Sequence, residues 1–131
     1  MKRFFIFLCI VLIGCTASQQ KPQPAKVPPI QISTDELFNA YEENAVDADL
    51  KYKGKALIVS GTVDEITSGE TIQVVMPAKR AYGLLGVRCE FDRKYASDIA
   101  KLKKGQQIKV QGICNGVIGS VSLTNCSLLP Q

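Results

Sequence analysis

The sequence predicts a mainly β protein, a barrel of five strands with two helical segments, on the basis of three observations. Short runs rich in β-branched residues fill most of the chain after Gly54. A helical pattern precedes these runs, and a second one separates the third run from the fourth. The resulting order, a helix, three strands, a helix and two strands, is that of the OB-fold, a Greek-key barrel. Closing the barrel removes strand edges that an open α+β sheet, the alternative architecture, would expose.

The chain begins with the pattern of an export signal. Lys2 and Arg3 precede an apolar run over 4–13. This run is too short to cross a bilayer, which takes about 20 helical residues. The string "LIGC", which ends at Cys15, resembles the lipobox of bacterial lipoproteins, in which the cysteine sulfur receives a diacylglyceryl group. We therefore expect a signal peptide over 1–14 and lipidation at Cys15, against the alternative of a secreted protein cut nearby.

A lipidated Cys15 implies a bacterial cell-envelope protein held on a membrane. Several acyl chains anchor a protein stably, whereas a single chain does not. Thr16 follows the cysteine, where an Asp tends to retain Gram-negative lipoproteins at the inner membrane. The resemblance thus favours the outer membrane, with the protein facing the periplasm. The stretch "TASQQKPQPAKVPPIQ" is rich in Pro and Gln, so residues 15–31 are expected to form a flexible tether. The alternative is a proline-rich ligand for a partner protein.

The predicted domain over 32–131 begins with a helix. Ser33 and Glu36 fit a capping box at its start. Acidic side chains of this segment fall on the solvated face, opposite the face that is expected to pack against the strands. Five residues recur at helical spacing and mark the face expected to pack: Leu37, Tyr41, Ala45, Ala48 and Tyr52.

The strands are expected in two groups around a second helix. Gly61 interrupts the first strand run and suits a bulge or a sharp bend. The second helix, over 92–105, places Tyr95, Ile99 and Leu102 on one face and ends at a glycine. The five strand runs are 55–66, 70–76, 84–91, 106–114 and 120–129.

Four segments of the domain resemble a known family. They are "ELFNAYEENAVDADLKYKGKALIVSGTV" (36–63), "GVRCEFD" (86–92), "LKKGQQIKVQGICNG" (102–116) and "SLTNCSLL" (122–129). These segments resemble those of the OB-fold lipoproteins of the tRNA_anti-like family. The resemblance implies an OB-fold in the bacterial envelope, and it implies no particular activity or ligand.

The composition argues against an enzyme and against a metal site. The chain has no histidine, so the commonest general base near neutral pH and the imidazole ligands of zinc and copper are missing. Its cysteines lack the short paired spacings of a zinc site, and no phosphate-binding glycine motif occurs. We expect no catalytic residues, no metal and no cofactor.

The charge of the exported chain makes nucleic acid an unlikely partner in this reading. Loss of Lys2 and Arg3 with the signal would leave fourteen of the sixteen basic side chains against twelve acidic ones. Nucleic-acid binding is driven by positive side chains that release counter-ions from the phosphates, and this chain would have only a small excess of positive charge.

Cys9 would leave with the signal peptide, and Cys15 would carry the lipid. Three cysteines remain, which allows one intramolecular disulfide at most. The prediction is a bond between Cys114 and Cys126, on the last two strands. Cys89 alternates with Val87 and Phe91 and is expected to be a buried thiol. A bond between Cys89 and Cys126 is the competing arrangement, because the third and fifth strands of this barrel are neighbours.

One cluster joins cations to an aromatic ring and is the candidate ligand-binding site: Lys79, Arg80, Tyr82 and Arg88. OB-folds bind along the face of their second and third strands, where this cluster falls. The alternative is an ordinary solvated hairpin. We expect a non-catalytic binding module whose partner is an envelope protein or an oligosaccharide, with a structural role in an envelope complex as the first alternative and nucleic-acid binding as the second.

Overall fold

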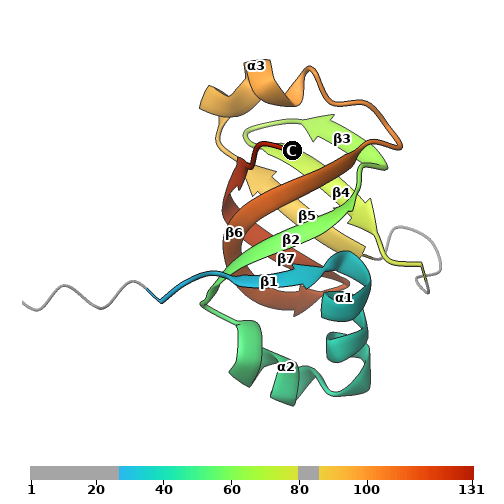
Figure 1. The fold of residues 1–131 in the computed structure, drawn as a ribbon, viewed down its shortest axis with the longest axis vertical. Helices are drawn as coiled ribbons and strands as arrows, with labels where there is room; N and C mark the ends of the chain where they lie inside the picture. Colours follow the sequence, from blue (N-terminus) through green and yellow to red (C-terminus); the bar gives the residue numbers. More distant parts are fainter. Residues whose placement is uncertain (1–26, 80–85) are drawn as a thin grey trace, which may run out of the picture.

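The computed structural model describes residues 27–79 and 86–131, which form one mixed sheet with helices at its ends (Figure 1). The strand order in the sheet is β1-β2-β6-β7-β5-β4-β3. In chain order the elements are β1 (Ile30–Ser33), α1 (Thr34–Glu43), α2 (Ala45–Tyr52), β2 (Ala56–Thr62), β3 (Glu65–Ser68), β4 (Ile72–Pro77), β5 (Gly86–Phe91), a 3₁₀ turn (Arg93–Tyr95), α3 (Ala96–Ile99), β6 (Gln107–Ile118) and β7 (Ser120–Leu128).

The sheet closes because β2 and β3 are two halves of one bent strand. The strand is interrupted at Val63 and Asp64, where the Asp64 amide donates to the Val75 carbonyl at 3.0 Å. The first half pairs with β6 and the second half pairs with β4, both antiparallel. The described residues therefore contain seven strands where the sequence predicted five, since one predicted strand is split and β1 is additional.

The first two residues of β1, Ile30 and Gln31, lie inside the segment that was predicted to be a flexible tether. Ile30 and Gln31 pair in parallel with Leu57 and Ile58 of β2. The prediction of a tether up to residue 31 is wrong at its end, because β2 offers a free edge to the chain that precedes α1. Ile30 and Ile32 also pack against the core.

The predicted first helix is divided into α1 and α2. The capping box at Ser33 is confirmed: its Oγ accepts from the Glu36 amide at 3.2 Å, and the Glu36 carboxylate accepts from the Ser33 amide at 3.0 Å. Asn44 ends α1, and its side chain accepts from the Val46 and Asp47 amides, which starts α2. An Asn side chain competes with the helical backbone for hydrogen bonds in this way, so one amphipathic pattern gives two helices. The expectation that Ala45 would pack is wrong, because the break leaves it exposed.

The predicted second helix is shorter than 92–105. It consists of a 3₁₀ turn and the four-residue α3. The predicted packing face is retained, since Ile99 is buried and both Tyr95 and Leu102 pack against the core. Gly105 follows with a φ of +86°, the left-handed conformation that glycine adopts without strain.

The core fills the barrel with alternating side chains of the strands. Leu57 and Val59 of β2 and Val87 and Phe91 of β5 are fully inaccessible to solvent. Gly61 continues the inward series of β2 and pairs regularly with Ile108, so the predicted bulge is not found at Gly61, and the bend of the strand lies two residues later, at Val63 and Asp64. A Cβ on Gly61 would lie 2.5 Å from Cγ2 of the buried Thr34, which is the reason that a glycine stands there.

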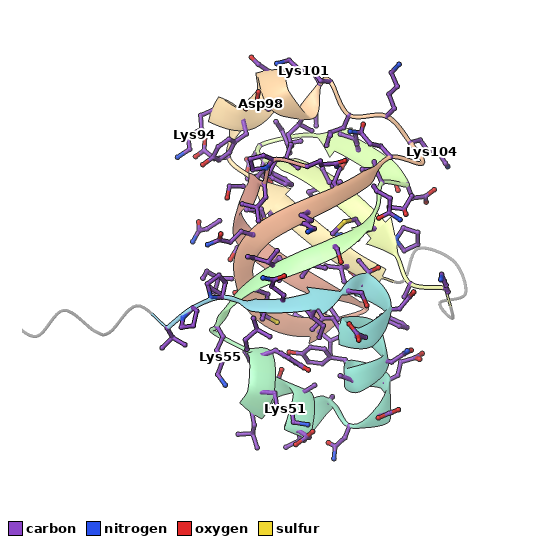
Figure 2. All side chains as sticks on the ribbon, viewed as in Figure 1. Lys51, Lys55, Lys94, Asp98, Lys101 and Lys104 are labelled. Carbon is purple, nitrogen blue, oxygen red and sulfur yellow. The ribbon has the colours of Figure 1, made fainter. Side chains whose placement is uncertain are left out.

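The helices lie at opposite ends of the barrel, α1 and α2 at one end and α3 at the other (Figure 1). Charged side chains extend from both ends: Lys51 and Lys55 lie near α2, whereas Lys94 and Lys101 lie near α3 (Figure 2). No helix in the described part of the chain combines the length and apolar character needed to span a membrane.

Candidate functional site

A cavity of about 390 Å³ opens on the barrel wall where β1 ends. β1 pairs with β2 only as far as Ser33, opposite Ser60, and the chain then turns into α1. The next residues of β2, Gly61 and Thr62, therefore lack a strand on this side. The end of β4 approaches from across the gap, and its Pro77 forms part of the cavity wall.

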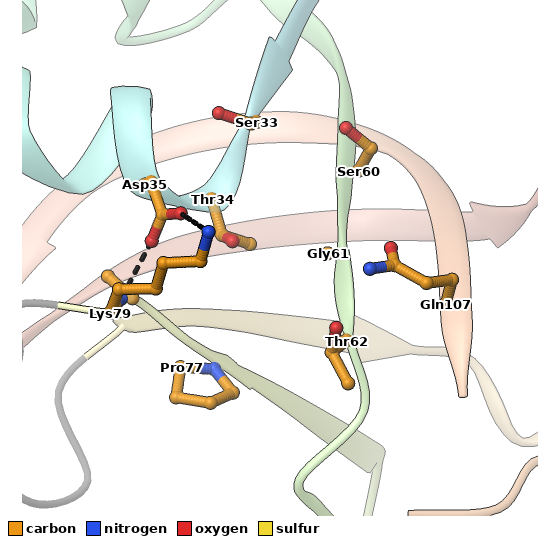
Figure 3. A pocket seen from close by; sticks show the side chains of 10 residues that line it. Ser33, Thr34, Asp35, Ser60, Gly61, Thr62, Pro77, Lys79 and Gln107 are labelled. Atoms are coloured by element: carbon orange, nitrogen blue, oxygen red, sulfur yellow. Dashed lines mark hydrogen bonds and ion pairs between the residues drawn. The ribbon is translucent and has the colours of Figure 1, made fainter. Parts of the chain in front are cut away.

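Most side chains of the cavity are polar and belong to four separate segments. On one side lie Ser60 and Thr62, whose side chains point outward because their neighbours on β2 point into the core. Figure 3 shows the Gln107 amide, at the start of β6, directed toward Gly61. The polar side chains that line the cavity are Ser33, Thr34, Asp35, Ser60, Thr62, Lys79 and Gln107.

An ion pair closes the opposite side of the cavity. Asp35 lies in the first turn of α1, and its Oδ1 accepts from the Lys79 amide at 2.7 Å. The Lys79 ammonium lies 3.9 Å from Asp35 Oδ2, and its side chain is almost fully exposed (Figure 3). The pair ties the end of β4 to the start of α1, and it leaves a cation and an anion at the rim.

Of the four predicted ligand-binding residues, the structure places Lys79 at this cavity. Arg80 and Tyr82 lie outside the described residues. Arg88 is exposed on β5 and does not line the cavity. Asp35, Ser60 and Gln107 are cavity residues that sequence reasoning missed. Asp35 lies in the first turn of α1, where the helix dipole favours an acidic residue, so its position gave no sign of a cavity. The polar alternation on β2 was the available signal for Ser60.

The outer face of β3, β4 and β5 is a second surface relevant to an OB-fold. Cross-strand pairing places Glu65, Val75 and Arg88 in one row, which continues to Ser122 on β7. In the neighbouring row, Glu90 lies opposite Gln73, which lies opposite Thr67. The two rows thus contain two acidic side chains, Glu65 and Glu90, and one basic side chain, Arg88.

Aromatic rings in the described residues belong to the core or its margin. Phe38, Tyr41 and Phe91 are buried, and Tyr52 and Tyr95 pack against the core cluster. None of these five rings lies on the two rows of the β3-β4-β5 face. A base-stacking platform is therefore missing from the described part of this face.

The three cysteines are buried free thiols, and the predicted bond between Cys114 and Cys126 is not formed in the structure. The two residues are not register partners, because Cys114 pairs with Leu123 and Cys126 pairs with Phe91. A hydrogen bond with the Cys126 thiol, together with complete burial, raises the pKa of Cys89 well above its ordinary value of 9.0. Cys89 is thus a buried thiol, as predicted, with Cys126 beside it.

Cys114 contacts a different partner. Its Sγ lies 3.4 Å from the Tyr41 hydroxyl, which donates to Asp49 Oδ1 at 3.1 Å. Burial raises the pKa of Tyr41 far above its ordinary value of 10.0, and the hydrogen bond with Cys114 is the next largest cause. The hydroxyl therefore stays protonated. This contact joins α1 and α2 to β6. Within the described ranges, no group of three or more His, Cys, Asp or Glu side chains is placed to hold a metal ion.

The profile of the tRNA_anti-like family matches residues 3–128 of the chain. The protein belongs to the tRNA_anti-like family. A comparison with curated proteins finds no match.

Solved structures similar to this family member are OB-like. A candidate nucleic acid-binding lipoprotein from Klebsiella pneumoniae superposes with a TM-score of 0.65 at 19% identity, over 78% of this chain and 92% of that one. The S. pombe Stn1-Ten1 complex gives 0.45 at 13% identity, over 58% and 59% of the two chains. An OBody bound to hen egg-white lysozyme gives 0.45 at 16% identity, over 62% and 84%. The first of these similarities supports the fold of the tRNA_anti-like protein.

Proposed function

We propose that this protein is a lipid-anchored module of the bacterial envelope that binds an oligosaccharide in the cavity beside β1. The carrying observation is the composition of the cavity, in which hydroxyl, amide, carboxylate and ammonium groups surround about 390 Å³. The hydroxyl and amide groups donate and accept hydrogen bonds, the carboxylate accepts them and the ammonium donates them, which together match the hydroxyl groups of a sugar. Asp35 offsets the charge of Lys79, so the cavity suits a neutral polar ligand better than a polyanion.

The structural part of this proposal is tested by neutral N-acetylglucosamine oligosaccharides titrated into the full chain by calorimetry. Gln107→Ala should weaken binding about tenfold, because it removes an amide that can bind the ligand on both its donor and acceptor sides. Gln111→Ala is the matched control: it removes the same side chain from the same strand, outside the cavity. Equal affinities of the two variants would place the ligand elsewhere.

Lipid anchoring at Cys15 supports the envelope location and is tested separately. Mass spectrometry of the mature protein should find the acyl mass on Cys15, and Cys15→Ser should release the protein from membranes. An unmodified amino terminus at another residue would contradict the anchor without affecting the cavity.

Nucleic-acid binding is the second candidate, because a similar structure is described as that of a candidate nucleic acid-binding lipoprotein. The rows on β3, β4 and β5 weigh against it, since Glu65 and Glu90 would repel phosphates next to Arg88. We expect no binding of a dT oligonucleotide at 150 mM salt. Affinity that falls steeply between 50 and 200 mM salt would instead favour phosphate recognition.

An assembly role without a small ligand is the remaining alternative. Pull-down from solubilised envelope distinguishes it from sugar recognition. A co-purifying glycan supports the cavity proposal, whereas one stoichiometric protein partner that is retained by Gln107→Ala supports assembly.

A further inference from the structure

Two of the three buried thiols lie together, and the third provides a comparison within the same chain. Cys89 on β5 and Cys126 on β7 both point inward from paired strands, since Cys126 is the register partner of Phe91, two residues from Cys89, and the two thiols form a hydrogen bond. Cys114 on β6 is instead in contact with the Tyr41 hydroxyl. Only the first two thiols therefore face a sulfur partner.

The backbone is irregular on both sides of Cys126. The register of β5 against β7 shifts between Cys89 and Phe91, and the register of β6 against β7 shifts next to Gly112. Asn125 has a φ of +51°, a left-handed conformation that is uncommon outside glycine. Two residues, Thr124 and Asn125, consequently separate the inward side chains of Leu123 and Cys126. Bulges of this kind redirect a side chain, and here the redirected side chain is the Cys126 thiol.

Gly112 provides the space that this thiol occupies. A Cβ at residue 112 would lie 2.7 Å from Cys126 Sγ. A glycine, two register shifts and a left-handed asparagine thus combine to hold the Cys126 sulfur inside the barrel next to Cys89. Strained backbone at a single position is often associated with a functional group.

A second cavity, of about 220 Å³, opens at the surface beside Cys126, whose side chain is 1% exposed. Its walls include Glu90, Tyr95, Thr124 and Asn125, and Cys126 also lines it, whereas Cys89 does not. A small molecule fits a volume of this size and a protein domain does not. Cys126 is therefore the thiol that an entering molecule would meet first.

We propose that Cys89 and Cys126 are a redox-active dithiol that low-molecular-weight disulfides oxidise through this cavity. The Cys126 thiol loses its proton to solvent, and its sulfur attacks one sulfur of the disulfide, which breaks the S–S bond and releases one thiolate. Cys89 then loses its proton and attacks the Cys126 sulfur of the mixed disulfide, which expels the second thiolate. Two protein thiols are oxidised to one disulfide, and the small disulfide is reduced to two thiols.

Treatment of the folded full chain with cystine, followed by quenching and a free-thiol count in denaturant, tests this proposal. Cys9→Ser and Cys15→Ser are included, so that only the three domain thiols report. Treatment with cystine should lower the count from three to one, and peptide mapping should find Cys89 joined to Cys126. The oxidised protein should melt about 10 °C or more above the reduced one, because a crosslink between β5 and β7 constrains the unfolded chain.

Single substitutions separate the pair from the third thiol. Cys114→Ser should fall from two free thiols to none, whereas Cys89→Ser and Cys126→Ser should each retain Cys114 as a free thiol and form no internal bond. Three thiols that remain free in the folded wild type would overturn the proposal, as would a bond to Cys114. Oxidation that requires prior unfolding in urea would overturn it too, because entry through the cavity needs the folded barrel.

Discussion

Gly61→Ala should destabilise the domain because it adds a methyl group where the barrel has no room for one. The new Cβ would lie 2.5 Å from Thr34 Cγ2 and 3.1 Å from Met76 Sδ. Carbon atoms in favourable contact are about 3.5–4.0 Å apart, so the nearer contact is about 1 Å too short. Thr34 is the first residue of α1 and only 5% exposed, and Met76 is fully buried, so neither side chain has free space to enter.

Overpacking of this kind costs about 1–3 kcal/mol of unfolding free energy. For a domain of about 100 residues, this loss corresponds to a fall in Tm of about 5–20 °C. Thermal unfolding followed by circular dichroism measures it, and urea unfolding gives the free energy. Thr34→Ser removes the nearest atom, Cγ2, and should therefore recover part of the loss when combined with Gly61→Ala.

Gly69→Ala is the matched control, because the nearest atom to its Cβ would be the Thr71 carbonyl oxygen at 3.8 Å, an ordinary contact. It should leave the Tm within a few degrees of the wild type. The reasoning is refuted if Gly61→Ala is as stable as Gly69→Ala. It is also refuted if Thr34→Ser changes the stability equally in the wild type and in Gly61→Ala, since the two sites would then be independent.

Two further predictions concern buried and exposed hydrogen bonds. Tyr41→Phe should lower the unfolding free energy by about 1 kcal/mol in urea denaturation, because the hydroxyl joins Asp49 to Cys114 at a buried position; an unchanged midpoint would contradict this. Ser33→Ala should cost about 1 kcal/mol at pH 7 through the loss of the helix cap, measured in the same way. The Ser33 amide and hydroxyl hold the pKa of Glu36 below its ordinary value of 4.5, so the part of the cap that depends on the ionised Glu36 carboxylate is present above that pH and is lost as the pH falls through the lowered pKa, whereas the bond from the Glu36 amide to Ser33 Oγ does not titrate. The difference between Ser33→Ala and wild type should accordingly shrink in unfolding experiments below about pH 4, and a difference that grows there would refute the assignment.

The coarse alternation of helical and strand segments after β1, and several local features, followed from the sequence alone. The capping box at Ser33, the buried alternation of Val87, Cys89 and Phe91 and the packing of Ile99 each depend on residues a few positions apart. Periodicity and capping are encoded at that range, so they can be predicted without knowledge of the fold. Family membership was likewise predicted from quoted segments and is confirmed by a match over residues 3–128.

The tertiary structure decided which distant residues meet. Asp35 binds Lys79 across 44 positions, and together they form the rim of a cavity that exists only because β1 stops at Ser33. The same dependence explains the cysteines: spacing favoured Cys114 with Cys126, but two register shifts turn Cys126 toward Cys89. The register of the strands, the closure of the barrel and the bulges depend on how the whole barrel packs. A shift of the register by one residue exchanges the inner and outer faces of a strand. Local sequence patterns do not contain that information, which is why the cavity became visible only in the folded chain and why the sequence left Cys114 and Cys89 open as partners of Cys126.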